Sequence, residues 1–170
     1  RYREIEMSSA TANDGVKIYF EEVGTGLPII FCHEFAGDYR SWEAQLRFFS
    51  RRFRCITYSA RGYPGSDVPD DPDAYSQDHA RDDIIAVLDH LDVDQAYVVG
   101  LSMGAYAALQ VGLAYPQRSL GLVIASGGSG SEPDRIDDFR VSSRDVARQF
   151  EEQGSSVLAA TYGQGAARVQ

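Results

Sequence analysis

The serine at position 102 stands in a spacing that suits nucleophilic chemistry. The segment Gly100-Leu101-Ser102-Met103-Gly104 fits the pattern G-x-S-x-G, and it follows the apolar run Tyr97-Val98-Val99. We therefore expect a sharp strand-to-helix bend with Ser102 at its apex, where the hydroxyl could attack a carbonyl carbon. Flanking glycines would let the strand and helix backbones approach without a Cβ clash. The alternative is a serine that only caps an ordinary helix.

An attacking serine needs donors for the negative charge that develops on the carbonyl oxygen. The Met103 amide would lie at a helix N-terminus, where backbone N–H groups favour an anion. A second candidate loop, His33-Glu34-Phe35-Ala36-Gly37, starts directly after the apolar strand Ile29–Cys32. The two segments would meet if their strands are neighbours in one sheet.

The elements that would position these segments alternate between short apolar strands and helices. We predict strands over Arg3–Ser8, Val16–Val23, Leu27–Cys32, Cys55–Tyr58, Ala96–Val99 and Leu120–Ala125. We predict helices over Ser41–Phe49, Ser76–Leu91 and Ser102–Tyr115. This alternation is typical of an α/β fold with a mostly parallel sheet and helices on both faces. In the helix Ser76–Leu91 the amphipathic pattern places Asp82, Asp83 and Asp89 on the water side.

With Ser102 in place, residues 3–125 resemble the α/β-hydrolase family. The segment Cys32-His33-Glu34-Phe35 looks like the family's strand followed by a His-Gly-x loop, and Arg61-Gly62-Tyr63-Pro64-Gly65-Ser66 is similar to its Arg-Gly-x-Gly-x-Ser loop. The resemblance implies a serine hydrolase in which Ser102 is the nucleophile and the Phe35 and Met103 amides form the oxyanion hole. His33, Gly100 and Gly104 would support the site.

Two residues depart from the family pattern. Glu34 replaces the glycine of the His-Gly pair, and a carboxylate that pointed inward would oppose the developing negative charge. We expect it to point away and to be held by a backbone donor or an arginine. Pro64 replaces a glycine and should stiffen its loop. By the resemblance His33 is a structural loop residue, although its type would also suit a general base.

A serine needs a base and an acid, which in this fold follow it along the chain. His33, His79 and His90 all precede Ser102, and no histidine follows the carboxylates Glu132, Asp134, Asp137 and Asp138. We therefore expect the acid and the histidine beyond residue 170. The family's usual sheet has about eight strands and six are predicted here, so the sheet would be incomplete at its C-terminus.

Two regions are expected from this pattern. Residues 1–126 would form the N-terminal part of the hydrolase core. Residues 127–170 leave the alternating pattern, with predicted helices over Ser142–Glu152 and from Val157 to Ala160. That region would be a linker and the beginning of a helical lid.

The composition excludes several classes of partner. A net charge of −9 argues against nucleic acid, and no apolar stretch is long enough to span a membrane. Cys32 and Cys55 fall inside predicted buried strands, so free thiols and a cytoplasmic location are expected. No phosphate loop, dinucleotide motif or metal-ligand cluster is present, so no cofactor and no metal are implied. The expected partner is a small-molecule substrate, and the oligomeric state stays open.

The expected reaction is hydrolysis of an ester, lactone or related carbonyl compound through an acyl-enzyme on Ser102. A carbon–carbon bond hydrolase would use the same bend, and Gly-Leu-Ser-Met-Gly also resembles the bends of enol-lactonases and cofactor-free perhydrolases. Serine argues against the dehalogenases and epoxide hydrolases, which use an aspartate in this fold. A non-catalytic, hydrolase-like ligand-binding protein is the alternative from another class.

Overall fold

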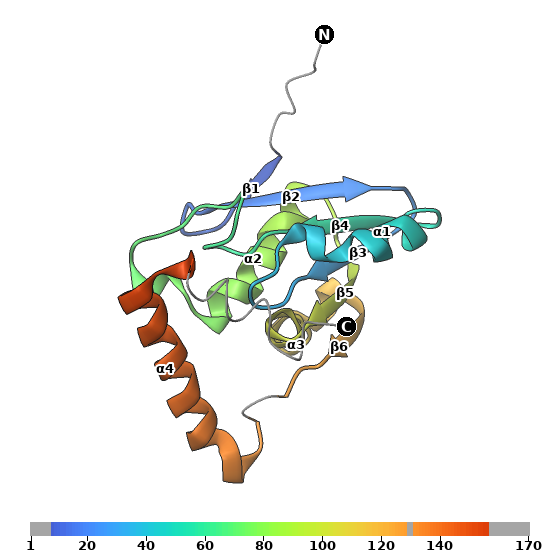
Figure 1. Ribbon diagram of the computed structural model, residues 1–170. Coiled ribbons are helices and arrows are strands. Elements are labelled where there is room, and N and C mark those ends of the chain that lie inside the picture. Colours follow the sequence, from blue (N-terminus) through green and yellow to red (C-terminus); the bar gives the residue numbers. More distant parts are fainter. Residues whose placement is uncertain (1–7, 129–130, 157–170) are drawn as a thin grey trace. The chain divides into compact units, whose positions relative to one another are not determined.

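The computed structural model describes residues 8–128 and 131–156 (Figure 1). Contacts between residues divide the chain into a first unit that ends at Gly127 and a second that begins at Gly128. The predicted strand Arg3–Ser8 lies outside the described residues except for Ser8, and the predicted helix Val157–Ala160 lies wholly outside them.

The first unit is built on one mixed sheet of six strands in the order β1-β2-β4-β3-β5-β6. Its strands are β1 (Ser9–Thr11), β2 (Lys17–Val23), β3 (Leu27–Cys32), β4 (Phe53–Tyr58), β5 (Ala96–Leu101) and β6 (Ser119–Ala125). The hairpin β1–β2 and the pair β2–β4 are antiparallel, whereas the pairs β3–β4, β3–β5 and β5–β6 are parallel. The predicted, mostly parallel sheet is confirmed.

Helices cover both faces of this sheet because consecutive strand residues point in opposite directions. Ile30 and Cys32 belong to a core that includes residues of α2 (Gln77–His90) and α3 (Met103–Ala114). Ile29 and Phe31 belong to a second core with Trp42, from the short 3-10 helix η1 (Tyr39–Trp42) that leads into α1 (Glu43–Phe49). Helices α2 and α3 therefore lie on one face and α1 on the other (Figure 1).

Helix ends fall close to the sequence expectations because the local signals are strong. The Ser76 side chain caps α2 by accepting a hydrogen bond from the His79 amide. Helix α3 ends at Ala114 with Tyr115 as its C-cap, and Pro116 follows. The predicted helix Ser41–Phe49 is instead a 3-10 turn followed by α1. Two further 3-10 turns, η2 (Pro72–Ala74) and η3 (Pro116–Arg118), connect the elements.

Strand β6 forms one edge of the sheet, and its apolar side chains are open to solvent on both faces. Leu120, Leu122, Val123 and Ile124 are each between 37% and 52% exposed. A central strand of a parallel sheet would have both faces covered. Among the residues that the structure describes, β6 pairs only with β5.

The second unit contains one long helix. A 3-10 turn, η4 (Pro133–Arg135), leads into α4 (Ile136–Gln153), and Gly154 ends α4 with a positive φ of 75°. This helix begins six residues before the predicted start at Ser142, because the acidic residues of its first turn, Asp137 and Asp138, favour a helix N-terminus.

Candidate active site

Ser102 forms the bend between β5 and α3 that its sequence pattern predicts. Its backbone has φ of 53° and ψ of −110°, a strained conformation for a residue with a side chain. The Ser102 amide donates to the Ala125 carbonyl at 2.8 Å, which fixes the bend against the end of β6. The Ser102 side chain makes no capping hydrogen bond to α3, so its hydroxyl is not used as an ordinary helix cap.

Gly100 and Gly104 permit this bend by removing side chains where backbones meet. A Cβ on Gly100 would lie 2.2 Å from the Gly104 carbonyl oxygen, and a Cβ on Gly104 would lie 2.2 Å from the Cys32 carbonyl oxygen. Since both obstacles are backbone atoms, no side-chain rotation could relieve them. The start of α3 therefore lies directly against the end of β3.

This contact brings the loop after β3 to the Ser102 bend. Strands β3 and β5 are parallel neighbours with Cys32 opposite Gly100, so their carboxyl ends lie side by side. Phe35 follows in that loop with 37% of its surface exposed, and Met103 is half-buried at the start of α3. The two segments that carry the predicted oxyanion donors thus lie next to each other at the carboxyl ends of the parallel strands, which we call the carboxyl edge of the sheet.

His33 is fully engaged in holding its loop. Its ring is 1% exposed, its Nε2 accepts from the Ala60 amide at 3.0 Å, and its Nδ1 lies 2.8 Å from the Glu34 carbonyl oxygen. These partners require a neutral ring with the proton on Nδ1. Burial also lowers the pKa of His33, which keeps the ring neutral. A ring with both nitrogens occupied in this way is suited to positioning and not to proton transfer.

Glu34 is held by a partner other than those expected. Its Oε1 accepts from the Ser41 hydroxyl at 3.3 Å, not from a backbone donor or an arginine. Its carbonyl oxygen also accepts from the Gly37 amide at 3.1 Å, which closes a tight turn. Within the described part of the chain, Glu34 Oε2 is buried without a hydrogen-bond partner.

A buried ion pair that sequence analysis missed anchors the loop after β4. Arg61, 5% exposed, donates to both carboxylate oxygens of Asp83 at 2.8 and 2.7 Å, and to Asp14 at 2.6 Å. It also donates to the Ala74 carbonyl at 2.7 Å. The prediction that Asp83 faces water is wrong, because this residue of α2 is 1% exposed and pairs with Arg61. The only sequence signal was the arginine that opens the Arg-Gly-x-x-Gly-Ser loop.

The remaining histidines belong to α2 and contact other groups. His79 contacts the Ser76 hydroxyl and lies 3.7 Å from Asp14, at the start of α2. His90 is exposed at the end of α2 and packs its ring on Phe20. Each of the three histidines therefore contacts groups other than Ser102. Downstream, Asp137 pairs with Arg140 within α4.

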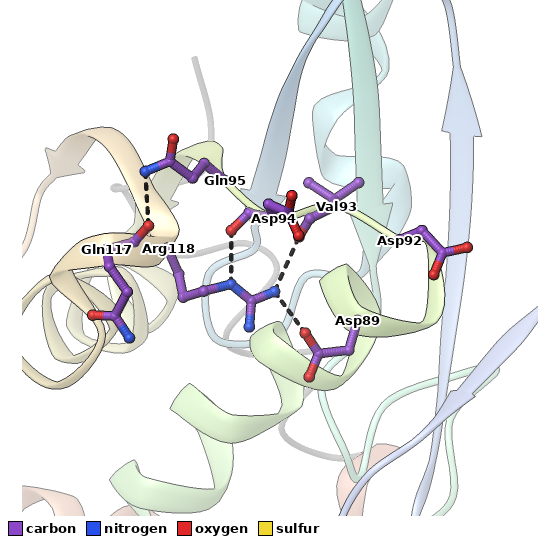
Figure 2. Close-up of a pocket in the computed structure, with 7 residues that line it drawn as sticks. All are labelled: Asp89, Asp92, Val93, Asp94, Gln95, Gln117 and Arg118. Atoms are coloured by element: carbon purple, nitrogen blue, oxygen red, sulfur yellow. Dashed lines mark hydrogen bonds and ion pairs between the residues drawn. The ribbon is translucent and has the colours of Figure 1, made fainter.

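A surface depression of about 650 Å³ lies at the opposite edge of the sheet (Figure 2). Its lining comes from the end of α2 and from the segments that lead into β5 and β6, namely Asp89, Asp92, Val93, Asp94, Gln95, Gln117 and Arg118. Arg118 lines the depression and donates to the Asp89 carboxylate and to the Val93 and Asp94 carbonyls. The depression therefore lies where the parallel strands begin, at the amino edge of the sheet, whereas Ser102 follows the end of β5.

Across residues 8–128 and 131–156, no group of three or more histidine, cysteine, aspartate or glutamate residues is arranged to hold a metal ion. In the same ranges no helix combines the length and the apolar character that crossing a membrane requires.

Comparison with known proteins agrees with this geometry. A family model described as the alpha/beta hydrolase fold matches residues 28–164. The chain is 33% identical over 121 residues to epoxide hydrolase 2 of Siraitia grosvenorii, covering 71% of this chain and 38% of that protein. It is 31% identical over 98 residues to 3-oxoadipate enol-lactonase 2 of Acinetobacter baylyi, covering 58% of this chain and 36% of the lactonase.

A solved structure of Est816, described as an enzyme that degrades N-acyl homoserine lactones, is also similar. It superimposes with a TM-score of 0.66 at 34% identity, covering 90% of this chain and 63% of Est816. The chain spans less than half the length of the two curated relatives named above. The family match, the sheet order and the Ser102 bend lead to one conclusion: the chain belongs to the α/β-hydrolase fold family.

Proposed function

We propose that the protein is a serine hydrolase that cleaves an ester or lactone through an acyl-enzyme on Ser102. The observation that carries this proposal is the strained backbone of Ser102, with φ of 53° and a hydroxyl that does not cap α3. Strain of this kind costs free energy and persists where the surroundings impose it, often at functional sites. A purely structural turn at this position would be satisfied by an ordinary serine cap.

In the proposed reaction the Ser102 oxygen attacks the substrate carbonyl and forms a tetrahedral intermediate. The Met103 and Phe35 amides would donate to the oxyanion, since both belong to segments that meet where β3 and β5 end. Collapse of the intermediate would expel the alcohol and leave the acyl-enzyme, which water then hydrolyses. We expect the histidine base and its acid from residues outside this sequence, because both ring nitrogens of His33 are occupied and all three histidines precede Ser102.

The substrate class rests on the relatives that act on lactones. One relative is named an enol-lactonase, and Est816 is described as degrading N-acyl homoserine lactones. The epoxide hydrolase is equally similar in sequence. Because family epoxide hydrolases attack with an aspartate, Ser102 supports the carbonyl substrate over the epoxide. The carbon–carbon hydrolase and perhydrolase alternatives would use the same serine and differ in the pocket.

Two further expectations belong to this proposal. We propose that residues 127–170 begin a lid, which is supported by the apolar side chains Phe139 and Val141 of α4, 45% and 57% exposed. We also propose a cytoplasmic location. This is supported by the free thiols of Cys32 and Cys55, whose burial raises the pKa of each and that of Cys32 to about 12.

The test is covalent labelling of the full-length protein with a fluorophosphonate, followed by peptide mapping. We expect the label on Ser102, and we expect Ser102→Ala to abolish labelling and to lower p-nitrophenyl acetate hydrolysis by about 10⁴-fold or more. Ser50→Ala is the matched control, since Ser50 follows α1 at the amino edge of the sheet and should leave both measurements unchanged. A folded wild-type protein that fails to label would refute catalysis and favour a ligand-binding role.

A further inference from the structure

Tyr63, in the loop after β4, contacts both the loop after β3 and the start of α3 beside the Ser102 bend. It belongs to the loop after β4, whose shape is fixed by hydrogen bonds from the Tyr63 amide to the Ala60 carbonyl and from the Ser66 amide to the Tyr63 carbonyl, both 3.1 Å long. The buried Arg61 anchors the same loop to α2 through Asp83. These bonds hold the loop backbone at Tyr63 rigid. The Tyr63 side chain itself is half-buried.

The Tyr63 side chain contacts both loops of the candidate site. Its ring meets the His33 ring edge to face, with centroids 4.7 Å apart and planes at 69°. Its hydroxyl donates to the Met103 sulfur at 3.6 Å. The strand order β4-β3-β5 explains this reach, since the loop after β3 lies between the other two.

Both contacts fall beside a backbone amide that the proposed reaction uses. His33 lies two residues before Phe35 and fixes the loop through its bond to the Glu34 carbonyl. Met103 directly follows the strained Ser102 and opens α3. A side chain that restrains both segments sets the separation between the two amides, and oxyanion donors lose their effect when displaced by a fraction of an ångström.

We propose that Tyr63 is a positioning residue that couples the loop after β3 to the Ser102 bend, so that the Phe35 and Met103 amides converge on one oxyanion. This inference rests on the proposed serine hydrolase function. Tyr63 would act through its contacts with His33 and Met103. Its effect should therefore fall on turnover and leave substrate binding almost unchanged.

The test compares variants of the full-length protein in p-nitrophenyl acetate hydrolysis and in the rate of fluorophosphonate labelling. Tyr63→Phe keeps the ring contact and loses the weak bond to sulfur, so we expect kcat to fall about two- to fivefold. Tyr63→Leu loses both contacts, and we expect kcat to fall about 10- to 100-fold with KM changed less than about threefold. The matched control is Tyr75→Phe, which removes a hydroxyl in the same loop that donates to the Pro69 carbonyl.

A double-mutant cycle with Met103→Leu separates positioning from general stability. If the hydroxyl acts through the Met103 sulfur, Tyr63→Phe should lower kcat in the wild-type background and have no further effect in Met103→Leu. Additive losses, or wild-type kcat in Tyr63→Leu, would overturn the inference while labelling of Ser102 still upheld the proposed function. A wild-type protein that does not label at Ser102 would overturn both.

Discussion

Substituting Gly104 by alanine tests whether the start of α3 must touch the end of β3. The added Cβ would lie 2.2 Å from the Cys32 carbonyl oxygen and 2.7 Å from the His33 carbonyl oxygen. An ordinary carbon–oxygen contact is about 3.3 Å or longer, so one of the two segments must move by roughly 1 Å. Because Ser102 and Met103 lie at this helix start, the displacement is passed to the proposed nucleophile and oxyanion donor.

The magnitude of the effect follows from this displacement. A misplacement of about 1 Å at a reacting centre costs on the order of a hundredfold in rate, so we expect the kcat of Gly104→Ala to fall by about that factor. Overpacking costs about 1–3 kcal/mol, but alanine returns roughly 1 kcal/mol in helix propensity. The free energy of unfolding should therefore fall by at most about 2 kcal/mol, and the protein should stay folded.

The assay is p-nitrophenyl acetate hydrolysis and fluorophosphonate labelling at a temperature where circular dichroism shows the full-length variant to be folded. Gly112→Ala is the matched control in the same helix, because its Cβ would meet the Leu122 Cδ1 atom, the end of a partly exposed side chain that can rotate. We expect this control to keep wild-type kcat and stability. A Gly104→Ala protein with wild-type kcat would refute the argument that these backbones are in contact.

Three other predictions concern the residues around the site. Glu34→Gln should retain most activity, because the carboxylate is bonded to Ser41; a loss of kcat beyond about a hundredfold would reveal a direct role. Arg61→Met should destabilise the protein by about 3–5 kcal/mol in urea unfolding, because it leaves Asp83 buried and unpaired, whereas Asp14→Asn should cost about 1 kcal/mol or less at a partly exposed site. The bond to Arg61 lowers the pKa of Asp14 below its unfolded value of 3.8, so the Asp14→Asn deficit should be full at neutral pH and shrink as pH falls below about 4. A deficit that grew with acid would contradict this assignment.

The strands of the sheet and the Ser102 bend could be predicted from the sequence because both depend on local patterns. Apolar runs of strand length alternate with helical periodicity, and the glycines at 100 and 104 leave room where two backbones meet. The serine at position 76 likewise marked the start of α2.

The contacts between loops could not be predicted because they depend on strand order. Along the chain β4 lies between β3 and β5, but in the sheet β3 lies between the other two. This difference between chain order and strand order places Tyr63 in contact with His33 and Met103. No local sequence pattern predicts the strand order. Asp83 was misassigned for a related reason, since an aspartate in an amphipathic helix is normally solvated unless a distant arginine reaches it.

The bond between Arg61 and Asp14 connects the turn of the β1–β2 hairpin to the loop after β4. The tip around Gly15 is open, with no atom within 4 Å of a Cβ placed there, and such tips are normally the first choice for inserting a tag or splitting a chain. Here an insertion would separate Asp14 from Arg61, which anchors the loop that carries Tyr63, so a change at the hairpin would also affect that loop.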